Sequence, residues 1–169
     1  LGASTEEAQL NVAIDVAEAI AQVLEGGLPR NAVNMVAIPP EVMEKLAPYL
    51  SLAEKLGSFL AQTAGGISRL QVTYSGALVD LQTGPITTSI LKGMLERIVD
   101  DHVNLVNAEY LAKRRGIKVE TVHRGNGDDY HNRIGIQAET AEGTFTVAGS
   151  VFQPDSPRLV QINGYRLDL

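Results

Sequence analysis

The stretch IGIQAETAEGTFTVAGSV, residues 134–151, decides the fold class of this chain. Apolar side chains recur at every second position on both sides of a short turn, which is the period of a strand with one buried face. They are Ile134, Ile136 and Ala138 before the turn, and Phe145, Val147 and Val151 after it. The turn at residues 141–143 ends in a glycine. The stretch therefore predicts two strands that pair as an antiparallel hairpin.

Four more segments, further out along the chain, carry strand signals. Residues 68–74 alternate apolar and polar side chains, and a shorter strand is expected at residues 77–81. Residues 117–122 continue the strand pattern, and a last strand begins at residues 160–162. The Asn-Gly pair at residues 163–164 is a strong signal for a tight hairpin turn.

Apolar residues at helical spacing mark four helices. The first covers residues 4–25 and ends at two glycines, and the second covers residues 40–64 with a break or kink at Pro48. Two shorter helices are expected at residues 85–98 and 107–115. Because the helices are separated from a late run of hairpin strands, the sequence predicts an α+β fold. We expect helices packed on one face of a mixed, mostly antiparallel sheet, preceded by the long N-terminal helix.

The helix at residues 4–25 is apolar over most of its circumference. Ser4 is its expected N-cap, and Glu7 completes a capping box. Its polar side chains form one narrow stripe, which consists of Asn11, Asp15, Glu18, Gln22 and Glu25. A surface helix needs an apolar stripe only a little wider than about 100°. We therefore expect this helix to pack against a second copy of the chain, which makes the protein a homo-oligomer.

The composition excludes several classes of protein. The 169 residues include no cysteine, are 44% hydrophobic and 20% charged, and carry a formal charge of -6. The absence of cysteine excludes a disulfide scaffold and a cysteine-ligated zinc site, and the negative charge argues against nucleic acid as a partner. The sequence has neither an apolar run of about 18 residues nor an export signal, so we expect a cytoplasmic protein with no membrane partner. The chain begins at Leu1 without a methionine, so it is expected to be a piece of something larger.

One run, residues 123–131, carries enough ligand types for a metal site. Its candidate ligands are His123, Asp128, Asp129 and His131. Their spacing fits no regular site, and Arg124 in the same run repels a cation. A run rich in Gly, Asn and Asp is more typical of a solvated loop, so we expect no metal. Metal-assisted catalysis by these four residues remains the rival hypothesis.

Two arginines flank the expected turn at residues 163–164. A hairpin brings Arg158 and Arg166 to one edge, and a guanidinium binds phosphate or carboxylate through two parallel hydrogen bonds. The alternative is two unrelated surface arginines, and spacing alone favours it. The sequence contains neither a P-loop nor a G-x-G-x-x-G turn after a strand.

Several segments resemble the D-3-phosphoglycerate dehydrogenase family. The opening run LGASTEEAQ, residues 1–9, is similar to the segment that follows the catalytic histidine in that family. The other matching segments are residues 31–34, 40–43, 52–57, 91–93, 103–108 and 160–164. Their shared order makes the resemblance specific, and together they cover essentially the whole chain.

The resemblance implies that residues 1–30 are the terminal helix of a truncated catalytic portion, residues 31–40 a linker, and residues 41–169 the family's intervening regulatory domain. The parent enzyme oxidises 3-phosphoglycerate with NAD in the first step of L-serine biosynthesis. Gly2 and Ala3 are the cofactor-adjacent residues that the resemblance carries over. This fragment is expected to be non-catalytic and to need no cofactor.

The resemblance also implies a role for the two arginines. In some members, basic residues bracket the VQING segment and bind a substrate-like anion, and Arg158 and Arg166 stand at those positions here. Relatives carry Lys or His there, so the charge is kept while the geometry differs. A phosphorylated small molecule is the expected ligand. The alternatives are the similar domain of an iron–sulfur L-serine dehydratase and a purely structural spacer that joins subunits.

Overall fold

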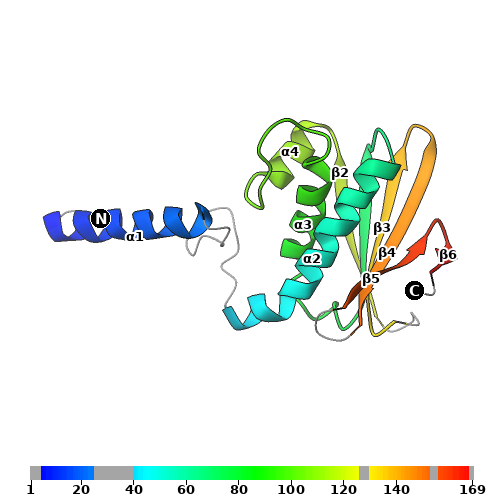
Figure 1. Cartoon of the computed structure of the whole chain (residues 1–169), viewed down its shortest axis with the longest axis horizontal. Helices are drawn as coiled ribbons and strands as arrows, with labels where there is room; N and C mark the ends of the chain where they lie inside the picture. The colour runs from blue at the N-terminus through cyan, green and yellow to red at the C-terminus, as the bar shows by residue number, and fades with distance from the viewer. Residues whose placement is uncertain (1–4, 25–39, 126–129, 153–155, 168–169) are drawn as a thin grey trace. The chain divides into compact units, whose positions relative to one another are not determined.

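A computed structural model describes residues 5–24, 40–125, 130–152 and 156–167 of the chain (Figure 1). Two compact units are present, Leu1–Pro40 and Glu41–Leu169. Each unit is considered by itself below.

The described part of the first unit is the helix α1 (Glu6–Leu24). Its cap is Thr5, whose Oγ1 accepts a hydrogen bond from the Ala8 N–H at 3.2 Å. The expected cap, Ser4, lies outside the described residues. The large apolar side chains of α1 are exposed, as the apolar circumference of its sequence predicts. They are Leu10, Val12, Ile14, Val16, Ile20 and Leu24.

The second unit is built on one six-stranded sheet, in the order β2-β1-β3-β4-β5-β6. The strands are β1 (Arg69–Gly76), β2 (Lys118–Arg124), β3 (Asn132–Thr140), β4 (Gly143–Val151), β5 (Pro157–Ile162) and β6 (Tyr165–Arg166). Within the described residues, β1 pairs with β2 in parallel, and the other four pairings are antiparallel. The expected hairpin is confirmed as β3 and β4, in which Ile136 pairs with Val147.

Three helices cover one face of this sheet (Figure 1). They are α2 (Pro40–Thr63), α3 (Gly84–Leu95) and α4 (Ala108–Arg114). The alternating apolar positions of β1 and β3 are buried beneath them, including Val72, Tyr74 and Ile134. The expected α+β fold, with helices on one face of a mixed and mostly antiparallel sheet, is therefore confirmed.

Two glycines allow the backbones of α2 and α3 to come into direct contact where the helices cross. A Cβ on Gly57 would meet the Ile90 carbonyl oxygen closer than 3.0 Å, and a Cβ on Gly93 would meet the Glu54 carbonyl oxygen equally closely. Each glycine therefore lies against the backbone of the opposite helix. The same crossing carries an ion pair, in which Lys92 Nζ lies 2.8 Å from Glu54 Oε1.

Two expectations differ from the structure. The strand predicted at residues 77–81 is wrong, because Gly76 takes a φ of 67° and turns the chain, and Leu81 N–H then bonds back to the Leu78 carbonyl at 3.2 Å. Of the break or kink expected at Pro48, the break is wrong, since α2 continues through the proline to Thr63. Buried leucines on both sides of this proline, Leu46 and Leu52, hold the helix against the sheet.

Candidate functional site

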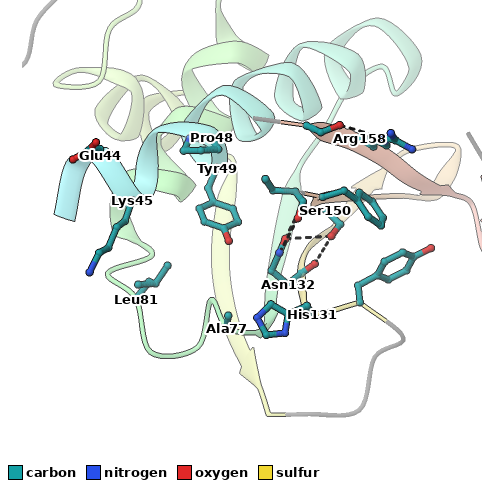
Figure 2. A pocket seen from close by; sticks show the side chains of 14 residues that line it. Glu44, Lys45, Pro48, Tyr49, Ala77, Leu81, His131, Asn132, Ser150 and Arg158 are labelled. Carbon is teal, nitrogen blue, oxygen red and sulfur yellow. Dashed lines mark hydrogen bonds between the residues drawn. The ribbon is translucent and has the colours of Figure 1, made fainter. Parts of the chain in front are cut away.

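A cavity of about 900 Å³ opens at one end of the sheet in the second unit (Figure 2). One wall comes from the first half of α2, and another from the segment that follows β1. The start of β3, the end of β4 and the start of β5 supply the rest. Residues far apart in sequence therefore line one space, which is the usual arrangement of a small-molecule site.

The floor of the cavity is fixed by Asn132, the first residue of β3. Its Nδ2 donates to the Val151 carbonyl at 2.9 Å, and its Oδ1 accepts from the Val151 N–H at 2.8 Å. Ser150 Oγ donates to the Asn132 carbonyl at 2.6 Å. Asn132 and Ser150 are buried. Their polar atoms are bound to neighbouring strands, so they hold the floor rigid.

A close backbone approach sets the position of His131 at the cavity edge. Gly76 has a φ of 67°, and a Cβ there would overlap the His131 carbonyl. The same carbonyl accepts a hydrogen bond from the Ala77 N–H at 2.9 Å. Only glycine satisfies both the left-handed φ and the short approach.

Arg158 supplies positive charge to the wall formed by β5. Its guanidinium carbon lies 5.4 Å from the centre of the Phe152 ring, and its Nε donates to Ser156 Oγ at 3.4 Å. Tyr130 packs edge-on against Phe152, with 5.9 Å between ring centres. The aromatic pair and the serine thus support the guanidinium from one side, in a cation–π arrangement.

The helical wall carries a tyrosine, a cation and an acid. Figure 2 shows the Tyr49 ring hanging from α2 into the cavity. Partial burial raises the pKa of its hydroxyl, so Tyr49 stays a neutral donor and acceptor at pH 7. Lys45 and Glu44 line the same wall, and Figure 2 shows their charged ends directed apart.

Arg166 lies elsewhere on the same β-hairpin. It pairs with Gln161 across β5 and β6, and Gln161 Oε1 also accepts a hydrogen bond from Arg133 Nη2. The tight turn expected at residues 163–164 is confirmed, because both residues have positive φ. Arg158 is three residues before Gln161, which places it about 10 Å away along the strand. Among the described residues that line the cavity, Arg158 is present and Arg166 is not.

The other candidate site residues are only partly described. Gly2, Ala3, Asp128 and Asp129 lie outside the described residues. His123 Nε2 lies 2.9 Å from Thr83 Oγ1, and its ring centre is 5.6 Å from that of Tyr74. No group of three or more His, Cys, Asp or Glu suited to a metal occurs within the described parts of the chain. Nor do those parts contain a helix long and apolar enough to cross a membrane.

Of these three cavity-lining residues, the sequence pointed to Arg158 as a candidate but not to Lys45 or Tyr49. Both missed residues lie on a long amphipathic helix, where a Lys or Tyr is ordinary surface chemistry. Only the packing of α2 across the end of the sheet brings them to the same space as Arg158.

The chain is similar to one family along most of its length. Residues 45–163 match the family model described as the D-3-phosphoglycerate dehydrogenase intervening domain. A D-3-phosphoglycerate dehydrogenase of Synechocystis sp. is 40% identical over 100% of this chain and 31% of its own length. One of Methanocaldococcus jannaschii is 40% identical over 98% of this chain and 32% of its own. A chloroplastic one of Arabidopsis thaliana is 46% identical over 70% of this chain and 20% of its own.

The chain spans about a third or less of the length of these relatives. Among solved structures, dipicolinate-bound dihydrodipicolinate reductase from Paenisporosarcina sp. TG-14 aligns with 84% of this chain and 60% of its own. The TM-score is 0.39 at 11% sequence identity, a likeness too distant to support an argument about function.

Proposed function

Because this chain belongs to the D-3-phosphoglycerate dehydrogenase family, we propose that it acts as the regulatory and assembly portion of such an enzyme and is itself non-catalytic. The match to the intervening domain covers most of the second unit, Glu41–Leu169. That unit carries a preformed cavity, but the described residues around it supply no nucleophile paired with a base. A binding role suits such a site better than a chemical one.

The ligand of this domain is a phosphorylated small molecule, with Arg158 and Arg166 as its anion partners. The observation that carries the proposal is the position of Arg158 on the cavity wall, held by Phe152 and Ser156. A guanidinium supported in this way loses little freedom when it binds phosphate. Arg166 lies on the next strand of the same hairpin and does not line the cavity, so it adds positive charge near the ligand while Arg158 makes the direct contact.

Thermal unfolding with inorganic phosphate or 3-phosphoglycerate tests the proposal. For a Kd of about 0.1 mM, 10 mM ligand stabilises the domain by about 2.7 kcal/mol, which raises Tm by roughly 5–10 °C. We expect Arg158→Ala with Arg166→Ala to abolish the shift, and Arg114→Ala on α4 to keep it. If the ligands leave the Tm of the parent chain unchanged, or shift the Tm of the double variant equally, the proposal is contradicted. The domain would then be a purely structural spacer.

Self-association is the second part of the proposed role. The exposed apolar side chains of α1, such as Ile14 and Ile20, supply the contact with a second copy. We expect light scattering to give the mass of an oligomer, and Ile14→Glu with Ile20→Glu to lower it. A strict monomer at concentrations of about 0.1 mM contradicts this part.

The whole protein is proposed to oxidise 3-phosphoglycerate with NAD in the cytoplasm. Support comes from the names of the relatives and from the histidine-following motif at residues 1–9. The resemblance of residues 1–9 supports Gly2 and Ala3 as neighbours of the NAD site in the whole protein. A full-length chain that reduces NAD when 3-phosphoglycerate is added, together with an inert 169-residue chain, is the expected outcome.

A further inference from the structure

We propose that the cavity takes a ligand with two acid groups joined by a flat apolar body, longer than a three-carbon phosphate. One acid group binds Arg158, and the other binds Lys45. This inference rests on the proposed effector site and names the class of molecule that fills it.

The size of the cavity argues for a ligand of this length. Its volume of about 900 Å³ lies in the upper part of the range of roughly 300–1,000 Å³ that is typical of sites for drug-sized ligands. A three-carbon acid phosphate leaves most of that space to water. A molecule with a ring between its acid groups fills more of it and displaces that water.

The charges argue for an acid group at each end. Arg158 comes from β5 on one wall, whereas Lys45 comes from α2 on another, and Figure 2 shows the two side chains on opposite sides of the cavity. His131 lies at the lower edge in the same view and offers a ring nitrogen as a further hydrogen-bond donor. Glu44 also lines the α2 wall, but its carboxylate is directed away from the Lys45 ammonium. Two separated cations favour two separated anions over one central phosphate.

The space between the two cations is lined by apolar and aromatic groups. Tyr49 projects into it from α2, and Pro48 and Leu81 extend the same surface. A flat ring has room to pack against the Tyr49 face. The Tyr49 hydroxyl has no hydrogen-bond partner among the described residues, so it is available to a polar atom of the ligand.

Calorimetric titration of the full 169-residue chain with four probes tests this inference. The probes are inorganic phosphate, 3-phosphoglycerate, phenyl phosphate and 4-carboxyphenyl phosphate. We expect 4-carboxyphenyl phosphate to bind at least tenfold tighter than either phenyl phosphate or 3-phosphoglycerate. Only this probe combines a ring with an acid group at each end.

Two variants separate the ends of the site. Lys45→Gln should reduce the affinity for 4-carboxyphenyl phosphate to that for phenyl phosphate, and leave phenyl phosphate itself unchanged. Arg158→Ala should weaken all four probes. Lys55→Gln is the matched control, because Lys55 is an exposed lysine of the same helix outside the cavity. Both lysines are exposed, so neither substitution should unfold the chain.

The outcomes distinguish this inference from the proposed function. If phosphate and 3-phosphoglycerate bind through Arg158 but 4-carboxyphenyl phosphate binds no tighter, the two-ended ligand is wrong and the effector site stands. If Lys45→Gln and Lys55→Gln have equal effects, the second acid group does not bind Lys45, and the inference is overturned. If none of the four probes binds, the proposed effector site and this inference both fail.

Discussion

Replacing Gly57 with alanine should destabilise the second unit at the crossing of α2 and α3. The new Cβ would lie 2.9 Å from Met94 N and closer still to the Ile90 carbonyl oxygen. Ordinary contact begins near 3.4 Å, so the helices must separate by about 0.5 Å at the Met94 nitrogen and by more than 1 Å at the Ile90 carbonyl oxygen. Both partners are backbone atoms, which no rotamer change moves.

The cost of this separation follows from the packing that it opens. A gap of about 0.5–1 Å removes roughly a quarter to a half of the dispersion energy of each affected contact, and overpacking typically costs about 1–3 kcal/mol. The higher helix propensity of alanine offsets about 1 kcal/mol of this cost. Because every close partner is a backbone atom, the cost should reach the upper end of that range, about 3 kcal/mol, and we expect a net loss of about 2 kcal/mol in the free energy of unfolding.

Urea unfolding followed by near-ultraviolet circular dichroism of tyrosine measures this loss. All five tyrosines lie in the second unit, so the signal reports that unit alone. Gly65→Ala is the matched control, because nothing lies within 4 Å of a Cβ at that position. It should change stability by less than about 0.5 kcal/mol. Equal midpoints for Gly57→Ala and Gly65→Ala would refute the close helix crossing.

Three further substitutions test other parts of the core. Tyr74→Phe removes a 2.7 Å hydrogen bond to Thr87 Oγ1 and should cost about 1 kcal/mol at pH 7. Burial opposes ionisation of the Tyr74 hydroxyl and raises its pKa above the ordinary value of 10.0, so the parent chain also loses stability as the pH rises above about 10, where the unfolded chain's tyrosine ionises first. Urea midpoints between pH 7 and 10.5 should therefore fall less in Tyr74→Phe than in the parent. Asn132→Ala leaves the buried N–H and carbonyl of Val151 without their hydrogen-bond partner, and should lower the free energy of unfolding by about 2–4 kcal/mol in the same assay. A loss below about 1 kcal/mol would contradict these two hydrogen bonds. Gly76→Ala forces a φ of 67° on a residue with a Cβ and should lower the urea midpoint more than Asn132→Ala does, because the Cβ also meets the backbone of the next strand.

Local patterning predicted most of the sheet, because each strand has one buried face and the side-chain period is then unambiguous. The hairpin of β3 and β4 and the turn at residues 163–164 are examples. The prediction of a strand at residues 77–81 was wrong, and the reason is also local. Its apolar residues include Leu78, which is fully buried by the fold while the backbone follows a turn. Apolar content alone does not distinguish a strand from a turn that is buried.

Of the residues that line the candidate site, the sequence pointed to only one as an anion-binding residue, a charged residue near a predicted turn. Arg158 was found because it precedes an Asn-Gly hairpin and matches a basic position of the family. Lys45 and Tyr49 were not, since their relation to Arg158 depends on how α2 crosses the end of the sheet. That crossing depends on contacts distant in sequence, such as Gly149 of β4 against Leu52 of α2. No short window of sequence contains both partners.

The most direct test of the central claim is an amide NMR titration of the isotopically labelled chain with 3-phosphoglycerate. If the second unit is an effector-binding domain, the amides of His131, Ser150, Phe152 and Arg158 should shift together and saturate at millimolar ligand, while those of α4 stay in place. No shift at 10 mM ligand, or shifts that gather away from this cavity, would contradict the claim.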